Sequence, residues 1–177
     1  MTAIALFAAP SARRRAPYEN WRPPIIGVSV LAPVGNSDLV LPRFQDGTFA
    51  LPTGAVEKGQ SPEDAGRAVL TGLADELPVQ RRVVVDEVQM RRRQVITYVV
   101  ITEPLTSREA CALVYRDPRA DLLVLPKRHA LSSLARKGKL RAFLGLQAAE
   151  IGAMLHLRDG QISRVEDVQP QDVPPNR

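Results

Sequence analysis

The chain has 177 residues, 45% of them hydrophobic and 24% charged, which suits one domain with a sizeable core. Its net charge of +5 fits a solvated basic surface or a partner rich in phosphate, and charge alone does not distinguish nucleic acid from a nucleotide. A single cysteine, Cys111, excludes an internal disulfide and is consistent with a cytoplasmic location. Because it lies in an apolar stretch, we expect Cys111 to be a small core residue.

The N-terminal end of the chain, residues 1–22, is expected to be a flexible arm. Its basic cluster, Arg13–Arg15, follows the apolar start of the chain, which reverses the order found in a secretory signal. No apolar run in the sequence is long enough to span a membrane. The arm is free in this interpretation to contact a partner subunit or an acidic surface.

Short apolar segments that predict strands follow the arm. Residues 25–34, IIGVSVLAPV, are rich in β-branched side chains and predict a buried strand. The turn sequence of residues 35–38 predicts that residues 39–41 pair back on this strand as a hairpin. A further short strand is predicted at residues 48–51.

The next element is a helix whose start is marked by Ser61 and Pro62. Serine is a strong N-cap residue, and proline suits the first helical position. We expect this helix to run to about Thr71, with either Gly72 or Pro78 ending it.

The second half of the chain predicts further strands and then helices. Strands mixed with helices in this order indicate an α/β protein with a mixed sheet flanked by helices. The predicted elements are strands at residues 82–87, 94–102 and 122–125, helices at residues 130–136 and 140–155 that are separated at Gly138, and a loosely ordered Pro-rich tail at residues 158–177.

One motif carries a resemblance to a known family. Residues 47–65, GTFALPTGAVEKGQSPEDA, resemble the front half of the Nudix box, G-x5-E-x7-R-E-U-x-E-E-x-G-U with U apolar, which is the signature of the Nudix (MutT-like) hydrolases. Leu51-Pro52, Gly54, Glu57 and Gly59 match the family's pattern. The resemblance implies a Nudix-type α/β/α sandwich over residues 23–157, between the arm and the tail.

The back half of the box departs from the family's pattern. Gln60 replaces the first glutamate, and an ungapped match puts the three later glutamates on Val69, Gly72 and Leu73. The family's glutamates hold Mg²⁺ or Mn²⁺, and hard cations of this kind need carboxylate oxygens. A degenerate box of this kind makes ordinary metal-dependent hydrolysis doubtful.

A match shifted by three residues recovers two carboxylates, Asp75 and Glu76. Three added helical residues turn the helix face by about 300°, so these acids point about 60° away from the usual metal face unless the helix breaks near Gly72. With Glu57 on the loop, they form the candidate catalytic and metal-binding set. The ungapped match is preferred, in which Asp75 and Glu76 are a solvated pair and Glu57 braces the loop.

Basic residues supply candidate contacts to phosphate. The resemblance implies that the hairpin carrying Arg91, Arg92 and Arg93 lies near the substrate cleft, where guanidinium groups and the loop glycine Gly54 would bind substrate. On a strand at most two of the three arginines could face one ligand. The alternative is an exposed turn with solvated arginines.

Three functions remain open. The first is a Nudix hydrolase with a divergent box that cleaves a nucleoside diphosphate-type substrate with Mg²⁺ or Mn²⁺. The second is a non-catalytic Nudix-fold protein that binds such a ligand or serves in regulation or assembly, without metal. The third is altered chemistry with an apolar pocket in place of the metal. A small phosphate-containing ligand is the expected partner, nucleic acid lacks a supporting motif, and the family's frequent dimers make a homodimer an expectation.

Overall fold

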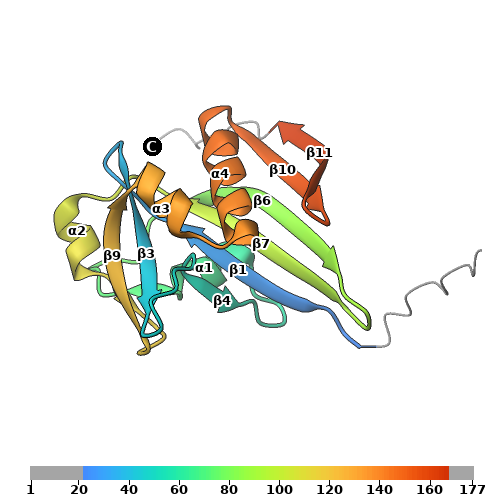
Figure 1. The fold of residues 1–177 in the computed structure, drawn as a ribbon, viewed down its shortest axis with the longest axis horizontal. Coiled ribbons are helices and arrows are strands. Elements are labelled where there is room, and N and C mark those ends of the chain that lie inside the picture. Colours follow the sequence, from blue (N-terminus) through green and yellow to red (C-terminus); the bar gives the residue numbers. More distant parts are fainter. Residues whose placement is uncertain (1–21, 168–177) are drawn as a thin grey trace, which may run out of the picture.

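A mixed β-sheet forms the centre of residues 22–167, the part of the chain that the computed structural model describes (Figure 1). In spatial order its strands are β11 (Gln161–Asp167), β10 (Ala153–Arg158), β6 (Val79–Gln89), β7 (Gln94–Thr102), β1 (Ile25–Leu31) and β4 (Thr53–Ala55). β1 pairs with β7 and β10 pairs with β6 in parallel, while the pairs β1–β4, β6–β7 and β10–β11 are antiparallel.

Two smaller sheets and four helices complete the described residues. The smaller sheets consist of β2 (Pro33–Val34), β3 (Asp38–Phe44) and β9 (Ala120–Pro126), and of β5 (Leu70–Thr71) and β8 (Val114–Tyr115). The helices are α1 (Pro62–Arg67), α2 (Ser107–Ala112), α3 (Lys127–Ser133) and α4 (Arg136–Glu150).

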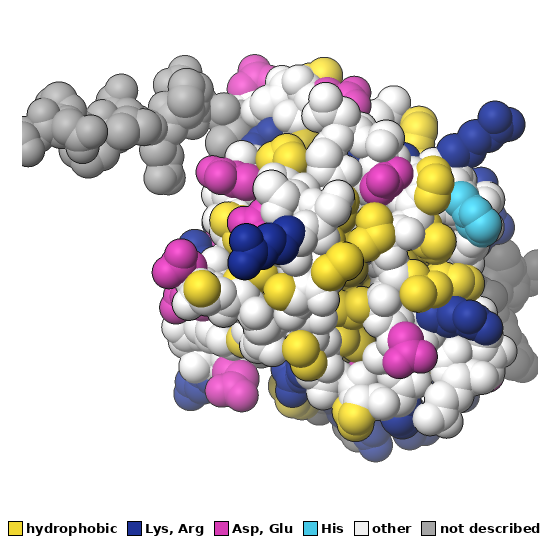
Figure 2. Space-filling model, turned by 90° about the vertical axis from the view of Figure 1, so that its left-hand side faces the viewer, with side chains coloured by type: hydrophobic (Ala, Val, Ile, Leu, Met, Phe, Trp, Pro, Cys, Tyr) yellow, Lys and Arg dark blue, Asp and Glu magenta, His cyan; other side chains and the backbone are white. Residues whose placement is uncertain are grey.

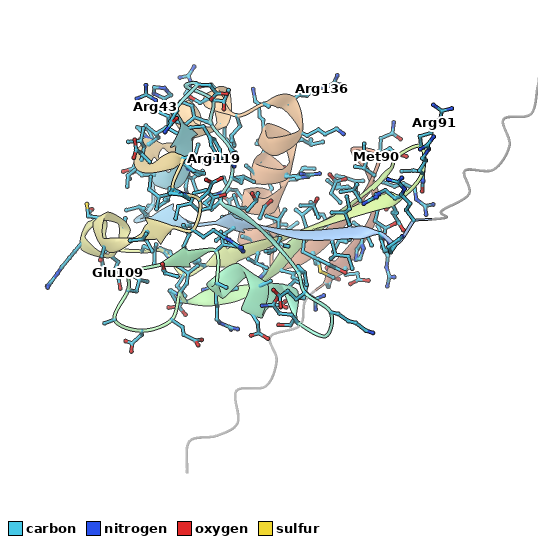
Figure 3. The ribbon with its side chains drawn as sticks, turned by 90° about the horizontal axis from the view of Figure 1, so that it is seen from below. Arg43, Met90, Arg91, Glu109, Arg119 and Arg136 are labelled. Carbon is cyan, nitrogen blue, oxygen red and sulfur yellow. The ribbon has the colours of Figure 1, made fainter. Side chains whose placement is uncertain are left out.

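Helices α1 and α4 cover opposite faces of the central sheet, as Figures 1 and 3 show. Alternation along the strands sorts the apolar side chains: Val100 packs on the α1 side, and its neighbours Val99 and Ile101 pack on the α4 side. One glycine in each helix allows close approach. A Cβ on Gly66 of α1 would lie 2.7 Å from Val100, and a Cβ on Gly145 of α4 would lie 2.6 Å from Leu31.

This architecture confirms the predicted α/β class, with a mixed sheet between helices. The strand predicted at residues 94–102 matches β7, and the predicted hairpin is formed by β2 and β3. No described helix is long and apolar enough to cross a membrane. Most of the expected N-terminal arm and the end of the expected tail, residues 1–21 and 168–177, lie outside the described residues.

Four predictions about elements other than α1 are wrong. Residues 48–51 form only an isolated bridge at Phe49. Gly138 lies inside the first turn of α4, so the break between the helices comes before Arg136. The long helix ends at Glu150, and residues 153–167 form the hairpin β10–β11, not a helix end and a loose tail.

Cys111 is exposed on α2 and not a core residue, contrary to expectation. It belongs to the side of the molecule formed by α2 and β9, which faces the viewer in Figure 2 and carries apolar side chains among charged ones. Val114 and Val124, 57% and 40% exposed, lie on β8 and β9. Short exposed helices such as α2 bury few of their residues, here only Ala110.

Candidate functional site

The loop between β4 and α1 is held by backbone and side-chain hydrogen bonds. The Val56 N–H donates to the Ile26 carbonyl (3.1 Å), which ties the loop to β1. The Glu57 N–H donates to Oε1 of Gln60 (3.1 Å), and the Gln60 N–H donates back to the Glu57 carbonyl (3.1 Å). Gln60, which stands in place of the box glutamate, therefore braces the loop with its side-chain amide.

Helix α1 begins where the sequence predicts. The Asp64 N–H donates to Oγ of Ser61 (3.1 Å), and Pro62 occupies the first turn. Arg67 and Asp64 form an ion pair at 2.6 Å within the same helix. These contacts confirm the predicted N-cap and fix the start of the helix.

The end of α1 differs from the prediction, because the helix stops at Arg67 and not near Thr71. The next residues form β5, in which Leu70 pairs with Tyr115 of β8. Gly72 then adopts a φ of +96°, a left-handed conformation that ends any helical path. The back half of the box is therefore not helical: residues 68–69 form a turn, Leu70–Thr71 a short strand and residues 73–75 a bend.

Val69 fills the space beside Gly54, the central residue of β4. Its side chain has 0% exposure, and its Cγ2 would lie 2.8 Å from a Cβ added to Gly54. The Nη1 of Arg116 would lie 3.5 Å from the same point. The surroundings of Gly54 thus combine an apolar side chain with a guanidinium group.

Tyr115 holds Arg116 near Gly54 of β4. Its hydroxyl accepts from the Thr53 N–H (3.2 Å) and donates to the Thr53 carbonyl (3.3 Å), so β8 is fastened to the residue before Gly54. Within residues 22–167, Arg116 makes no hydrogen bond or ion pair. Arg119 is engaged, because it pairs with Asp117 at 2.7 Å and lowers the pKa of that carboxyl from 3.8 to about 2. Sequence reasoning missed Arg116, because only the pairing of β5 with β8 brings it to the loop.

Comparison with solved structures identifies the fold. A MutT protein from Methanosarcina mazei Go1 aligns with a TM-score of 0.54 and 13% identity over 73% of this chain and 96% of its own. A Nudix hydrolase from Nitrosomonas europaea gives 0.56 and 9% over 78% and 80%, and one from M. smegmatis gives 0.53 and 23% over 73% and 86%. The chain has the Nudix fold. No family model matches the sequence, and no curated protein matches it.

The three acids predicted from the Nudix box do not form a cluster of carboxylates. Glu57 and Asp75 are exposed, and Oε2 of Glu76 lies 3.8 Å from Nε of Arg67, with 86% of the glutamate side chain exposed. The described residues contain no group of three or more His, Cys, Asp or Glu side chains that could hold a metal ion. With Val69 beside Gly54, this donor set does not fit the Mg²⁺ or Mn²⁺ of the Nudix box.

The arginines predicted to bind substrate lie at the tip of the β6–β7 hairpin. The Met90 N–H donates to the Arg93 carbonyl (3.0 Å) and closes the turn. Figure 3 shows Arg91 at the outer end of this hairpin, on the opposite side of the molecule from Arg43 and Arg119. The tip is thus well separated from the β3–β9 end of the Nudix fold.

Two neighbouring arginines of β6, Arg81 and Arg82, bind groups of the covering helices. Arg81 donates to the carbonyls of Ala148 and Ala149 (both 3.2 Å) and of Ala153 (2.8 Å), so it caps the end of α4. Arg82 donates to Glu63 of α1 at 2.7 Å. Each arginine thus joins one covering helix to the sheet.

Proposed function

We propose that this Nudix-fold chain binds a phosphate-rich ligand of the nucleoside diphosphate type without the metal of the Nudix box, and that it is not an ordinary metal-dependent diphosphate hydrolase. The observation that carries the proposal is the pair of side chains beside Gly54: a fully buried Val69 and the guanidinium of Arg116. The first offers no ligand to a metal, and the second offers a positive charge to phosphate.

Arg116 has the chemistry needed for the task. A guanidinium presents a planar set of N–H donors that can contact two phosphate oxygens at once, and it stays protonated at any physiological pH. Because the Tyr115 hydroxyl is hydrogen-bonded to both the N–H and the carbonyl of Thr53, the backbone before Arg116 is fixed relative to β4. Binding then requires little ordering of the protein.

The lack of clustered carboxylates in the described residues has a direct consequence for catalysis. In the Nudix family the metal would polarise the diphosphate and activate the attacking water. Here Glu57, Asp75 and Glu76 are the acids that a divergent hydrolase would have to use, and each is exposed with no described carboxylate cluster around it. An exposed, unclustered carboxylate binds a divalent cation weakly, so we expect no efficient turnover.

The test is calorimetry with ADP and UDP as probes, with and without MgCl₂. We expect binding that does not need Mg²⁺ and that weakens at least about tenfold in Arg116→Gln, the loss expected for one charge-assisted contact. Arg108→Gln, which removes an exposed arginine from α2, is the matched control and should bind as the unchanged protein does. A micromolar Mg²⁺ or Mn²⁺ site that disappears in Glu76→Gln, or Mg²⁺-dependent release of phosphate, would contradict the proposal.

Two further points belong to this proposal. A cytoplasmic location is supported by a chain with Cys111 as its only cysteine. Phosphate contacts by Arg91, Arg92 and Arg93 are proposed only for a ligand long enough to reach the hairpin tip, and the Arg116 test does not depend on them.

A further inference from the structure

A cavity lies on the α4 side of the sheet, away from Gly54. Its volume is about 430 Å³, within the range of small-molecule sites. It opens between β6, the start of α4 and the β10–β11 turn, whereas Gly54 belongs to β4 at the opposite edge of the central sheet. The residues that line it are Asp86, Val88, Arg136, Lys137, Leu140, Asp159, Gly160 and Gln161.

One wall of this cavity is the positively charged end of α4. The helix has no side-chain N-cap and no acid in its first turn, and it begins with Arg136 and Lys137. Within residues 22–167 neither of these side chains forms an ion pair. Cations at a helix N-terminus repel the helix dipole, whereas an anion there is stabilised by the dipole and by the free N–H groups. The arrangement becomes favourable once an anionic group enters the cavity.

Asp86 on β6 lines the same cavity and calls for a hydrogen-bond donor in the ligand. Its side chain is 5% exposed, and Oδ2 accepts a hydrogen bond from Nε of Arg141 at 2.7 Å. Oδ1 is buried and has no hydrogen-bond partner in the described structure. A buried carboxylate oxygen without a donor is costly, so this oxygen favours a ligand with an N–H or O–H group.

The third wall is a rigid turn. Asp159 and Gly160 adopt φ values of +51° and +81°, as a two-residue hairpin turn between antiparallel strands requires. The Asp159 N–H donates to the Glu87 carbonyl (2.9 Å), and its Oδ1 accepts from the Gln89 N–H (3.1 Å). These bonds fix the turn to β6, so the cavity wall is preorganised.

We infer that this cavity binds a small phosphate monoester that also carries an amino or hydroxyl donor, of the class of nucleoside monophosphates. Its phosphate lies at the start of α4 against Arg136 and Lys137, and its donor group faces Oδ1 of Asp86. Leu140 and Val88 supply the apolar part of the lining. The site is independent of Arg116 and of the function proposed for the Gly54 loop.

The experiment uses the full chain, with CMP and inorganic phosphate as the two probes, followed by calorimetry and by amide chemical shifts. CMP should bind and shift the amides of Gly160 and of the first turn of α4. Arg136→Gln with Lys137→Gln should weaken CMP binding at least about tenfold, because both charged donors are lost. Lys139→Gln, which removes a charge from the same turn but does not line the cavity, should leave binding unchanged.

Asp86→Asn tests the contact between Asp86 and the ligand's donor group separately from the phosphate contact. If the asparagine oxygen keeps the bond from Arg141, its NH₂ group faces the ligand's donor, so CMP binding should weaken while inorganic phosphate binds as before. A thermal melt confirms that this variant is folded. The inference is overturned if CMP binds no tighter than inorganic phosphate, if Lys139→Gln has the same effect as the double variant, or if CMP does not bind. Loss of CMP binding in Arg116→Gln would assign the nucleotide to the Gly54 loop instead.

Discussion

The packing of Gly54 against Val69 makes a quantitative prediction about stability. A methyl group added by Gly54→Ala would lie 2.8 Å from Cγ2 of Val69, whereas carbon atoms in good contact lie about 3.5–4.0 Å apart. Because Val69 has 0% exposure and lies in the core, it has no free space to move into. Overpacking of this kind costs about 1–3 kcal/mol of the free energy of unfolding.

The second substitution, Val69→Ala, removes two methyl groups from the same place. At about 0.8 kcal/mol for each buried carbon plus a cavity term, it should cost about 2–3 kcal/mol. In the double variant the methyl group on residue 54 enters the space that Val69 leaves. The two costs should therefore not add, and the double variant should be about 1–2 kcal/mol more stable than their sum.

The assay is urea denaturation followed by far-UV circular dichroism, for the single and double variants. Gly145→Ala is the matched control, because its Cβ would lie 2.6 Å from Leu31 on the other face of the sheet. Its cost should add to that of Val69→Ala within about 0.5 kcal/mol. Additive costs for the Gly54 and Val69 pair as well would refute the conclusion that Val69 occupies the space beside the loop.

Three further predictions concern stability and charge. Gly72→Ala should lower the free energy of unfolding in urea by about 2–4 kcal/mol, because φ is +96° and a Cβ would collide with the backbone carbonyl of Ala112. Gly47→Ala is the control: its φ is +80° but its surroundings are open, so it should cost only about 1 kcal/mol. Asp117 should titrate by NMR near pH 2, and because its pKa is lowered from 3.8, its stabilising pair with Arg119 should persist above that range and be lost as the pH falls through about 2. Arg81→Met should lower the unfolding free energy by about 2–3 kcal/mol, since three carbonyls near the end of α4 lose their donor, and an unchanged urea midpoint would contradict that capping role.

Elements with strong local signals could be predicted from the sequence. Ser61 and Pro62 mark the start of α1 because the cap depends only on nearby backbone. The β-branched run at residues 94–102 forms β7 because it is buried in the middle of the sheet. In both cases local preference and tertiary packing act in the same direction.

One missed element had a readable signal. Asp159-Gly160 is a favoured pair for a two-residue hairpin turn, and Arg158 pairs with Gln161 across it. The prolines that follow in the last residues suggested a loose tail and concealed this signal. The hairpin matters for function because its turn forms a wall of the cavity at Asp86.

The candidate site itself could not be read from the sequence, because it depends on a pairing between distant segments. Residues 68–77 contain no proline, so local rules allowed a longer helix. The pairing of Leu70 with Tyr115 joins segments 45 positions apart, by subtraction of their numbers, and decides against it. Arg116 reaches Gly54 of β4 through the same pairing, which no local pattern reveals.

The early end of α1 and the pairing of β5 with β8 belong to one local structure, so we expect that single substitutions would not rebuild a carboxylate cluster there. Carboxylates three and four residues apart converge on one helix face. Because Val69 lies in a turn and Leu73 in a bend, on either side of β5, glutamates at these two positions would not share such a face unless residues 68–73 became helical. That would expose Val69 and Leu70, which are 0% and 1% exposed, and would break the pairing that holds Arg116. In the observed arrangement the guanidinium of Arg116 lies beside Gly54, next to the buried Val69.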